Sequence, residues 1–274
     1  MKRIFYTFLI TFFIGLSANA QAENKANEDL ERAKPFLLNG DCNSTGISWV
    51  KSALKRDSNN VEAQELLNKC NDSKYDNAIS ILKENPTDFK AIRELEKLVE
   101  LDKYNTEETN FLLAKSLLEK NGANHYVHTY ITKAISFNQN NNEYRWIRTR
   151  CNLTSSSNGD DFSQAISDLT LMTENGAESA KVYANLGLAH QELADYTYRY
   201  EKAEKNDSFT DDNSKYIKEQ TKIYNKAITN YKDSIKAFRK SIEIGYENTS
   251  KLEYKIKDCE SYIVEVQSKI DNLK

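Results

Sequence analysis

Apolar residues recur at helical spacing along almost the whole chain, and this periodicity constrains the fold more than any other feature. Segments with apolar side chains three or four residues apart alternate with clusters of Asn, Asp, Ser, Gly and Thr. Only 2 Pro and 8 Gly residues occur in 274 positions, so few residues would interrupt a helix. The sequence contains no long alternation of apolar and polar residues of the kind that indicates strands. It therefore predicts an all-α protein.

The periodicity predicts about twelve helices, most of them only three or four turns long. Helices of that length are unstable alone and have to stack on one another. Capping residues support the boundaries: Gly245 follows the last periodic residue of one helix, and Ser250 with Glu253 forms a capping box for the next. The predicted ranges are 23–38, 44–56, 60–70, 73–85, 88–101, 106–120, 124–137, 142–153, 161–174, 179–205, 213–244 and 250–272.

The first twenty residues have the pattern of a secretory signal peptide. Lys2 and Arg3 precede an apolar run over residues 4–16, and Ala18-Asn19-Ala20 provides small residues for cleavage after Ala20. The alternative is a membrane anchor, but the run of about 13 residues is shorter than the roughly 20 that span a bilayer. We expect a mature protein outside the cytoplasm. Its richness in Asn and Lys, with Gln21 directly after the cleavage site, is typical of a bacterial periplasmic or secreted protein.

Charge and composition exclude some partners. Without Lys2 and Arg3 the chain has 36 basic and 41 acidic residues, a net charge of −5. Nucleic acids need a basic surface, so we expect no nucleic-acid partner. With 39% hydrophobic and 29% charged residues, the chain is too apolar for general disorder but polar for a compact globule. An elongated fold with much surface fits this balance.

The four cysteines are widely spaced. Cys42, Cys70, Cys151 and Cys259 match no metal-binding pattern. In an oxidising compartment Cys42 and Cys70, both near loops of adjacent helix pairs, could form a disulfide. The other interpretation is that all four are small core residues.

Two late helices carry a specific order of small and large residues. Tyr183, Leu186-Gly187 and His190 have the spacing aromatic, x2, Leu-Gly, x2, ring, and Ser234 precedes Phe238 by four positions. This order resembles the tetratricopeptide repeat (TPR), W-x2-L-G-x2-Y followed by A-x3-F. Small residues are needed where two helices cross closely, and large ones fill the gaps beside them. His190 stands where the family has Tyr, and the closing Pro is absent.

Weaker matches extend the resemblance over most of residues 28–245, although the repeat phase is undefined between residues 60 and 105. The resemblance implies a right-handed α-solenoid of stacked antiparallel helix pairs. It divides the mature chain into degenerate repeats over 21–105, TPR-like repeats over 106–249 and a capping helix over 250–274. The matching residues include Asn110, Leu113, Ala114 and Leu117 with Val127, Ile131 and Ala134, and Trp146 and Arg150 with Ala165 and Leu169.

The last repeat is too long. Gly187 and Ser234 are 47 positions apart, whereas about 12 separate these positions in the family, so about 35 residues are inserted. The apolar stripe continues through the insertion, which predicts a two-helix arm over residues 194–228. Tyr198 and Tyr216 fall off that stripe, and exposed Tyr favours interfaces. They form either an arm interface or the surface of a solvated hairpin.

No pattern in the sequence argues for catalysis. Known nucleophile, phosphate-binding and zinc motifs are missing. His125 and His128 lie three residues apart, but no third metal ligand is identifiable, so we interpret them as exposed polar residues. His190 occupies a packing position. We therefore expect no enzyme activity, no cofactor and no metal.

The resemblance also implies a concave groove lined by first helices, which binds a protein or peptide. The charge clamp that some family members use is not reproduced, because Ala184 and Leu188 occupy its positions. The leading hypothesis is a protein-binding scaffold of the cell envelope that acts through the groove, the arm or both. The alternatives are a subunit that self-associates through the arm and a soluble receptor for a glycan or small molecule. The groove residues would be Glu108, Phe111, Lys115, Glu119, Tyr144, Ile147, Cys151, Lys181, Ala184, Leu188 and Gln191.

Overall fold

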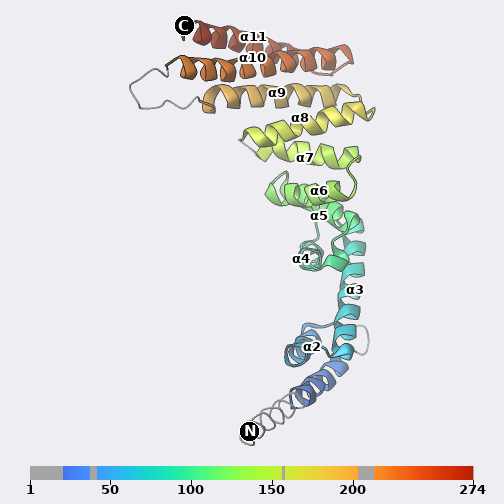
Figure 1. The fold of residues 1–274 in the computed structure, drawn as a ribbon. Helices are drawn as coiled ribbons and strands as arrows, with labels where there is room; N and C mark the ends of the chain where they lie inside the picture. The colour runs from blue at the N-terminus through green and yellow to red at the C-terminus, as the bar shows by residue number, and fades with distance from the viewer. Residues whose placement is uncertain (1–20, 38–41, 156–157, 203–212, 274) are drawn as a thin grey trace, which may run out of the picture. The chain divides into compact units, whose positions relative to one another are not determined.

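The computed structural model describes residues 21–37, 42–155, 158–202 and 213–273 (Figure 1). Within these ranges the regular structure is helical and contains no strand, which confirms the all-α prediction. The chain forms two compact units that divide between Asn105 and Thr106. The predicted signal peptide, residues 1–20, lies outside the described ranges, as does the connection over 203–212.

The first unit packs several helices around a small apolar core. A helix over residues 21–33 continues into the turn η1 (Lys34–Phe36). It is followed by α2 (Ser44–Arg56), α3 (Val61–Glu84), α4 (Phe89–Leu98) and the turn η2 (Asp102–Tyr104). The first helix, α2 and the start of α3 bury one cluster of apolar side chains: Ala26, Leu30, Ala33, Val50, Ala53 and Ala63.

Helix α3 corrects the sequence prediction. The predicted helices 60–70 and 73–85 are one continuous helix, because the polar stretch 71–73 contains neither Pro nor Gly and remains helical. The Asp72 side chain does not cap a new helix. It accepts hydrogen bonds from Lys103 and Tyr104 of η2, at 2.5 and 2.7 Å, and these bonds hold the pKa of Asp72 below its usual value.

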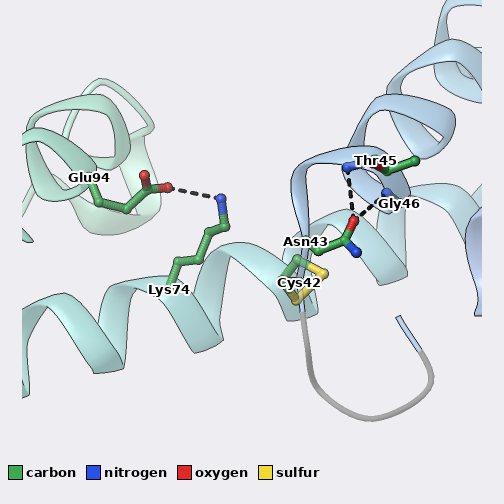
Figure 2. The surroundings of a disulfide bond; sticks show 7 residues. Cys42, Asn43, Thr45, Gly46, Lys74 and Glu94 are labelled. Carbon is green, nitrogen blue, oxygen red and sulfur yellow. Dashed lines mark hydrogen bonds and ion pairs between the residues drawn. A yellow bond between two sulfur atoms is a disulfide. The ribbon is translucent and has the colours of Figure 1, made fainter. Parts of the chain in front are cut away.

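A disulfide joins Cys42 to Cys70, the pair considered from the sequence (Figure 2). Cys42 directly precedes Asn43, the cap of α2, whose side-chain oxygen accepts hydrogen bonds from the backbone N–H groups of Thr45 and Gly46. Cys70 lies within α3. One turn after it, Lys74 donates to Glu94 of α4 at 3.1 Å. The middle of α3 is thus bound covalently to the start of α2 and by an ion pair to α4.

The second unit is a succession of helices of 13 to 31 residues. Each packs mainly against the next along the chain (Figure 1). Asn, Ser or Thr side chains cap many of them, because these side chains accept the N–H groups that a first turn leaves unpaired. Such caps are Thr106, Asn124, Asn158, Ser179 and Asn248. The helices are α5 (Glu107–Asn121), α6 (His125–Phe137), α7 (Asn142–Ser155), α8 (Gly159–Glu174), α9 (Ala180–Tyr200), α10 (Asn213–Glu243) and α11 (Thr249–Asp271).

Helices α9 and α10 approach closely at Gly187. A Cβ atom added to Gly187 would lie 2.5 Å from a ring carbon of Phe238, which is fully buried. Beside this contact, the buried Ser234 hydroxyl donates to the Gly187 carbonyl at 2.8 Å. The small and large residues that the sequence pattern singled out therefore meet at one crossing.

The extra length of the last helix pair is covered by a third helix. Helix α9 ends at Tyr200, earlier than the predicted 205, and α11 packs along α10. Ala194 and Ala227, which belong to the predicted arm, lie in one core cluster with Val266 and Ile270 of α11. The expectation of a projecting two-helix arm is therefore corrected for the described residues 194–202 and 213–228: they are part of a three-helix layer, because α11 supplies apolar side chains that pack against them.

We expect Cys42→Ser to lower the free energy of unfolding by roughly 3–4 kcal/mol, because the disulfide closes a loop of 28 residues in the unfolded chain. Thermal melts followed by circular dichroism measure the loss. A reductant should lower the melting temperature of the unchanged protein and leave that of the variant unaltered. Insensitivity of the unchanged protein to reductant would contradict the stabilising role.

We expect Gly187→Ala to destabilise the protein by roughly 1–3 kcal/mol, because the added methyl group displaces Phe238. Helix propensity alone predicts the opposite sign, a gain of about 1 kcal/mol. Urea unfolding measures the change. Combined with Phe238→Leu, the glycine change should cost less than it does alone, and additive losses would mean that the two residues do not contact each other.

Candidate functional site

The residues assigned to a concave groove do not form one open surface. Glu108, Lys115, Glu119 and Lys181 are exposed, Phe111 and Leu188 are half-buried, and Tyr144, Ile147, Cys151, Ala184 and Gln191 are buried. Neighbouring helices cover the buried ones. The Tyr144 ring packs 4.7 Å from that of Phe111, and Lys255 of α11 donates to Gln191 at 3.0 Å. The buried residues therefore hold helices together and offer no side chain to a partner.

Tyr198 and Tyr216, which were expected to be exposed at an arm interface, are both half-buried. Tyr198 is half-buried and donates to Glu265 of α11 at 2.6 Å, and its ring lies 5.9 Å from that of Tyr224. The hydrogen bond and then burial raise the pKa of Tyr198 to about 12. Tyr216 is half-buried near the start of α10. Tyr198 thus belongs to the contact between α9 and α11.

The histidines serve as hydrogen-bonding and packing groups. His128 Nε2 lies 3.0 Å from the Gln164 side-chain oxygen, and the His125 ring meets that of Tyr126 edge-on. Among the described residues, no group of three or more His, Cys, Asp or Glu side chains is arranged to hold a metal ion.

The two free thiols are unreactive because they are buried. Cys151 and Cys259 are buried, and burial raises the pKa of both. A thiol with a raised pKa remains protonated at neutral pH and is a poor nucleophile. Neither cysteine is therefore a candidate for catalysis.

A buried ion cluster joins α7 to α8, and it was not foreseen from the sequence. Asp168 is fully buried and accepts hydrogen bonds from Arg145 at 2.7 Å and from Arg148 at 2.7 and 2.8 Å. Arg145 also donates to the Gln139 carbonyl. Such a cluster can resemble a catalytic centre, but its carboxylate oxygens are already occupied by guanidinium groups. It therefore holds the two helices together.

An open groove between α9 and α10, of about 920 Å³, is the best candidate site. Helix α9 contributes Tyr183, Leu186 and His190, three half-buried residues spaced so that they lie on one helix face. Buried Ile235 and Ala237 of α10 add apolar surface. The remaining lining residues are charged: Lys232, Asp233, Lys236, Arg239, Lys240 and Glu243 of α10, with Glu260 of α11.

Ion pairs neutralise part of the charged lining. Arg239 pairs with Glu260 at 3.1 Å and Lys240 with Glu243 at 2.9 Å. Lys232 and Lys236 are exposed, lie one turn apart and have no ion-pair partner in the part of the chain that the structure describes. The groove thus offers two unpaired ammonium groups beside an apolar strip.

The hydrogen bonds of Asn230 fix the tautomer of His190. Asn230 Nδ2 donates to the Lys226 carbonyl at 3.1 Å, so its Oδ1 faces His190 Nδ1 at 3.0 Å. His190 Nδ1 must then carry a hydrogen and donate it. With this nitrogen engaged, the ring is positioned by the protein, and Nε2 is the nitrogen that this bond leaves available.

The repeat pattern predicts a packing role for Tyr183, Leu186 and His190 and does not predict the groove. The available signal was the row of basic residues on α10 at positions 232, 236, 239 and 240, which a helix places on one face. Chemically, this arrangement can donate hydrogen bonds, pair with anions and bury apolar surface. It contains no nucleophile with an adjacent base.

Comparisons with known proteins provide no family assignment. No protein-family model matches the sequence, and no curated protein matches it significantly. One similar solved structure is described as "Crystal structure of MamA protein"; it is 18% identical, and the match covers 81% of this chain and 96% of that chain. Its TM-score is 0.32, which is too low to carry an argument about fold or function.

None of the helices described is both long and apolar enough to cross a bilayer.

We expect Asp168→Asn to cost about 3–5 kcal/mol of unfolding free energy, because two buried guanidinium groups would lose their counter-charge. Asp160→Asn is the matched control on the same helix, and this exposed site should lose less than about 1 kcal/mol. Chemical unfolding of both variants provides the comparison. Equal losses would show that the cluster adds nothing beyond a surface charge.

Proposed function

We propose that this protein is an exported scaffold that binds other proteins through the groove between α9 and α10. The observation that carries the proposal is the groove itself, in which half-buried apolar residues lie beside two unpaired lysines. Protein-binding sites combine an apolar centre with a polar rim. In this proposal the pairs α5–α6, α7–α8 and α9–α10 are successive repeats of a right-handed solenoid.

The groove is suited to binding because both of its walls are regular helices. The α9–α10 crossing at Gly187 and the packing of α11 along α10 fix the relative position of the walls. A rigid site loses little conformational entropy when a partner binds. The volume of about 920 Å³ lies within the range of natural ligand sites and can accommodate a short stretch of a partner chain.

We propose a non-catalytic role, without cofactor, metal or nucleic acid. The two thiols are buried, the buried carboxylate of Asp168 is bound by arginines, and His190 Nδ1 is bound to Asn230. The groove lining binds and does not transfer protons in this proposal.

We also propose that the protein functions in the bacterial periplasm or outside the cell. The N-terminal sequence has the pattern of a signal peptide, and the Cys42–Cys70 disulfide suits an oxidising compartment. Self-association through the two-helix arm is disfavoured, because α11 already packs against Ala194 and Ala227 of the predicted arm. A glycan or small-molecule receptor has no specific support in the groove, whose lining is dominated by charged side chains.

A photo-crosslinking experiment tests the scaffold function. A benzophenone amino acid replaces Lys236 in the groove or, as a control, Lys257, which is exposed on α11. We expect discrete heterologous products in envelope extracts from the groove position only. Products of twice the mass of this chain would indicate self-association instead, and identical products from both positions would contradict a binding role for the groove.

A further inference from the structure

We propose that the partner segment bound between α9 and α10 is an acidic, amphipathic peptide. This inference rests on the proposed scaffold function and specifies the chemistry of the partner. It concerns residues other than those that the family resemblance assigned to a groove, since none of Tyr183, Leu186, Lys232 and Lys236 belongs to that set.

The charges of the groove lining select for acidic groups. Of its three acids, Glu243 and Glu260 are already paired with cations, which leaves Asp233 as the remaining carboxylate. Against it stand Lys232 and Lys236, so the unpaired groups have a net positive charge. A carboxylate of a partner gains an ion pair at these lysines, whereas a basic partner must approach two like charges.

The spacing of the lysines selects for a helical or turn-like arrangement of acids. Lys232 and Lys236 are four residues apart on one helix face, which puts their side chains about 6 Å apart at the backbone. Two Glu residues four positions apart on a partner helix have the same spacing. Such a partner can pair with both lysines at once.

The apolar lining requires the partner to be amphipathic. Tyr183 and Leu186 of α9 are half-buried and lie beside buried Ile235. Burying these exposed apolar surfaces against a partner side chain contributes about 25 cal/mol per Å². An acidic chain without apolar residues would leave that surface in water. A helix with Glu on one face and Leu on the adjoining face meets both requirements.

The overall charge of the protein opposes the binding of an acidic peptide. The mature chain has a net charge of −5, so its long-range field repels an acidic peptide. Attraction must therefore come from close contacts at the groove. The binding should weaken as salt increases, because exposed ion pairs are screened.

The test uses a fluorescein-labelled helical peptide with Glu at every fourth position and Leu on the adjoining face. Fluorescence anisotropy measures its binding to the oxidised mature chain, residues 21–274. Controls are the same peptide with Lys in place of Glu and a scrambled peptide of the same composition. We expect binding of the acidic amphipathic peptide alone. Absence of binding, or equal binding of the Lys peptide or the scrambled peptide, would overturn the inference.

A charge-reversal pair locates the interaction. We expect Lys232→Glu with Lys236→Glu to weaken binding roughly tenfold or more. The matched control is Lys218→Glu with Lys222→Glu, which has the same charge change and spacing at exposed positions of α10 outside the groove. It should change affinity less than about twofold. Equal weakening by both pairs would show that the peptide senses only net charge and would overturn the proposal.

Two further measurements keep the outcome interpretable. The neutral pair Lys232→Gln with Lys236→Gln avoids new repulsion and should also weaken binding, and circular dichroism checks the fold of each variant. If the acidic peptide does not bind but the benzophenone at position 236 still gives heterologous crosslinks, the acidic partner is rejected and the scaffold function remains supported. If the crosslinks are also absent, both the acidic partner and the scaffold function are rejected.

Discussion

The close crossing of α9 and α10 at Gly187 is the constraint on which the candidate site depends. Because Gly187 has no side chain, the Phe238 ring can lie against the backbone of α9, and Ser234 can donate to the Gly187 carbonyl. This contact fixes how far α10 is shifted and rotated relative to α9. It thereby places the basic row of α10 opposite Tyr183 and Leu186. A looser crossing would separate the apolar and charged halves of the groove.

Helix α11 converts the long helix pair into a stable layer. The extra turns of α9 and α10 expose more apolar surface than two helices can bury between themselves. Helix α11 covers this surface, and apolar side chains of all three helices form one cluster. Tyr231 shows the packing: its ring stacks 5.5 Å from that of Tyr262, and its hydroxyl donates to Asp195 of α9. Three helices therefore meet at this side chain. The groove lies where α11 contributes only Glu260.

Local chemistry could be predicted from the sequence, and contacts between distant residues largely could not. Helical periodicity indicated most of the helices, and the small residues Gly187 and Ser234 indicated a crossing. The predicted capping box of Ser250 with Glu253 was wrong, because α11 begins one residue earlier and Asn248 caps it by accepting the Lys251 N–H. The division of α3 was wrong because the polar stretch 71–73 resembles a loop in sequence, while the Asp72 carboxylate is bound by η2. The burial of Tyr144 depends on which helix covers it, which a repeat pattern does not specify. The Asp168 cluster joins residues 20 and 23 positions apart, and no local pattern encodes that pairing.

The distribution of satisfied and unsatisfied charge separates structural from recognition roles. Asp168 is buried, and arginines occupy its oxygens, so it stabilises the fold whether or not a partner is present. Lys232 and Lys236 are exposed and have no counter-charge within the described chain, so their pairing costs little desolvation and becomes available only with a partner. Their contribution is modest individually, and it determines specificity mainly through repulsion of basic chains. The apolar strip beside them supplies the affinity that exposed ion pairs alone do not provide.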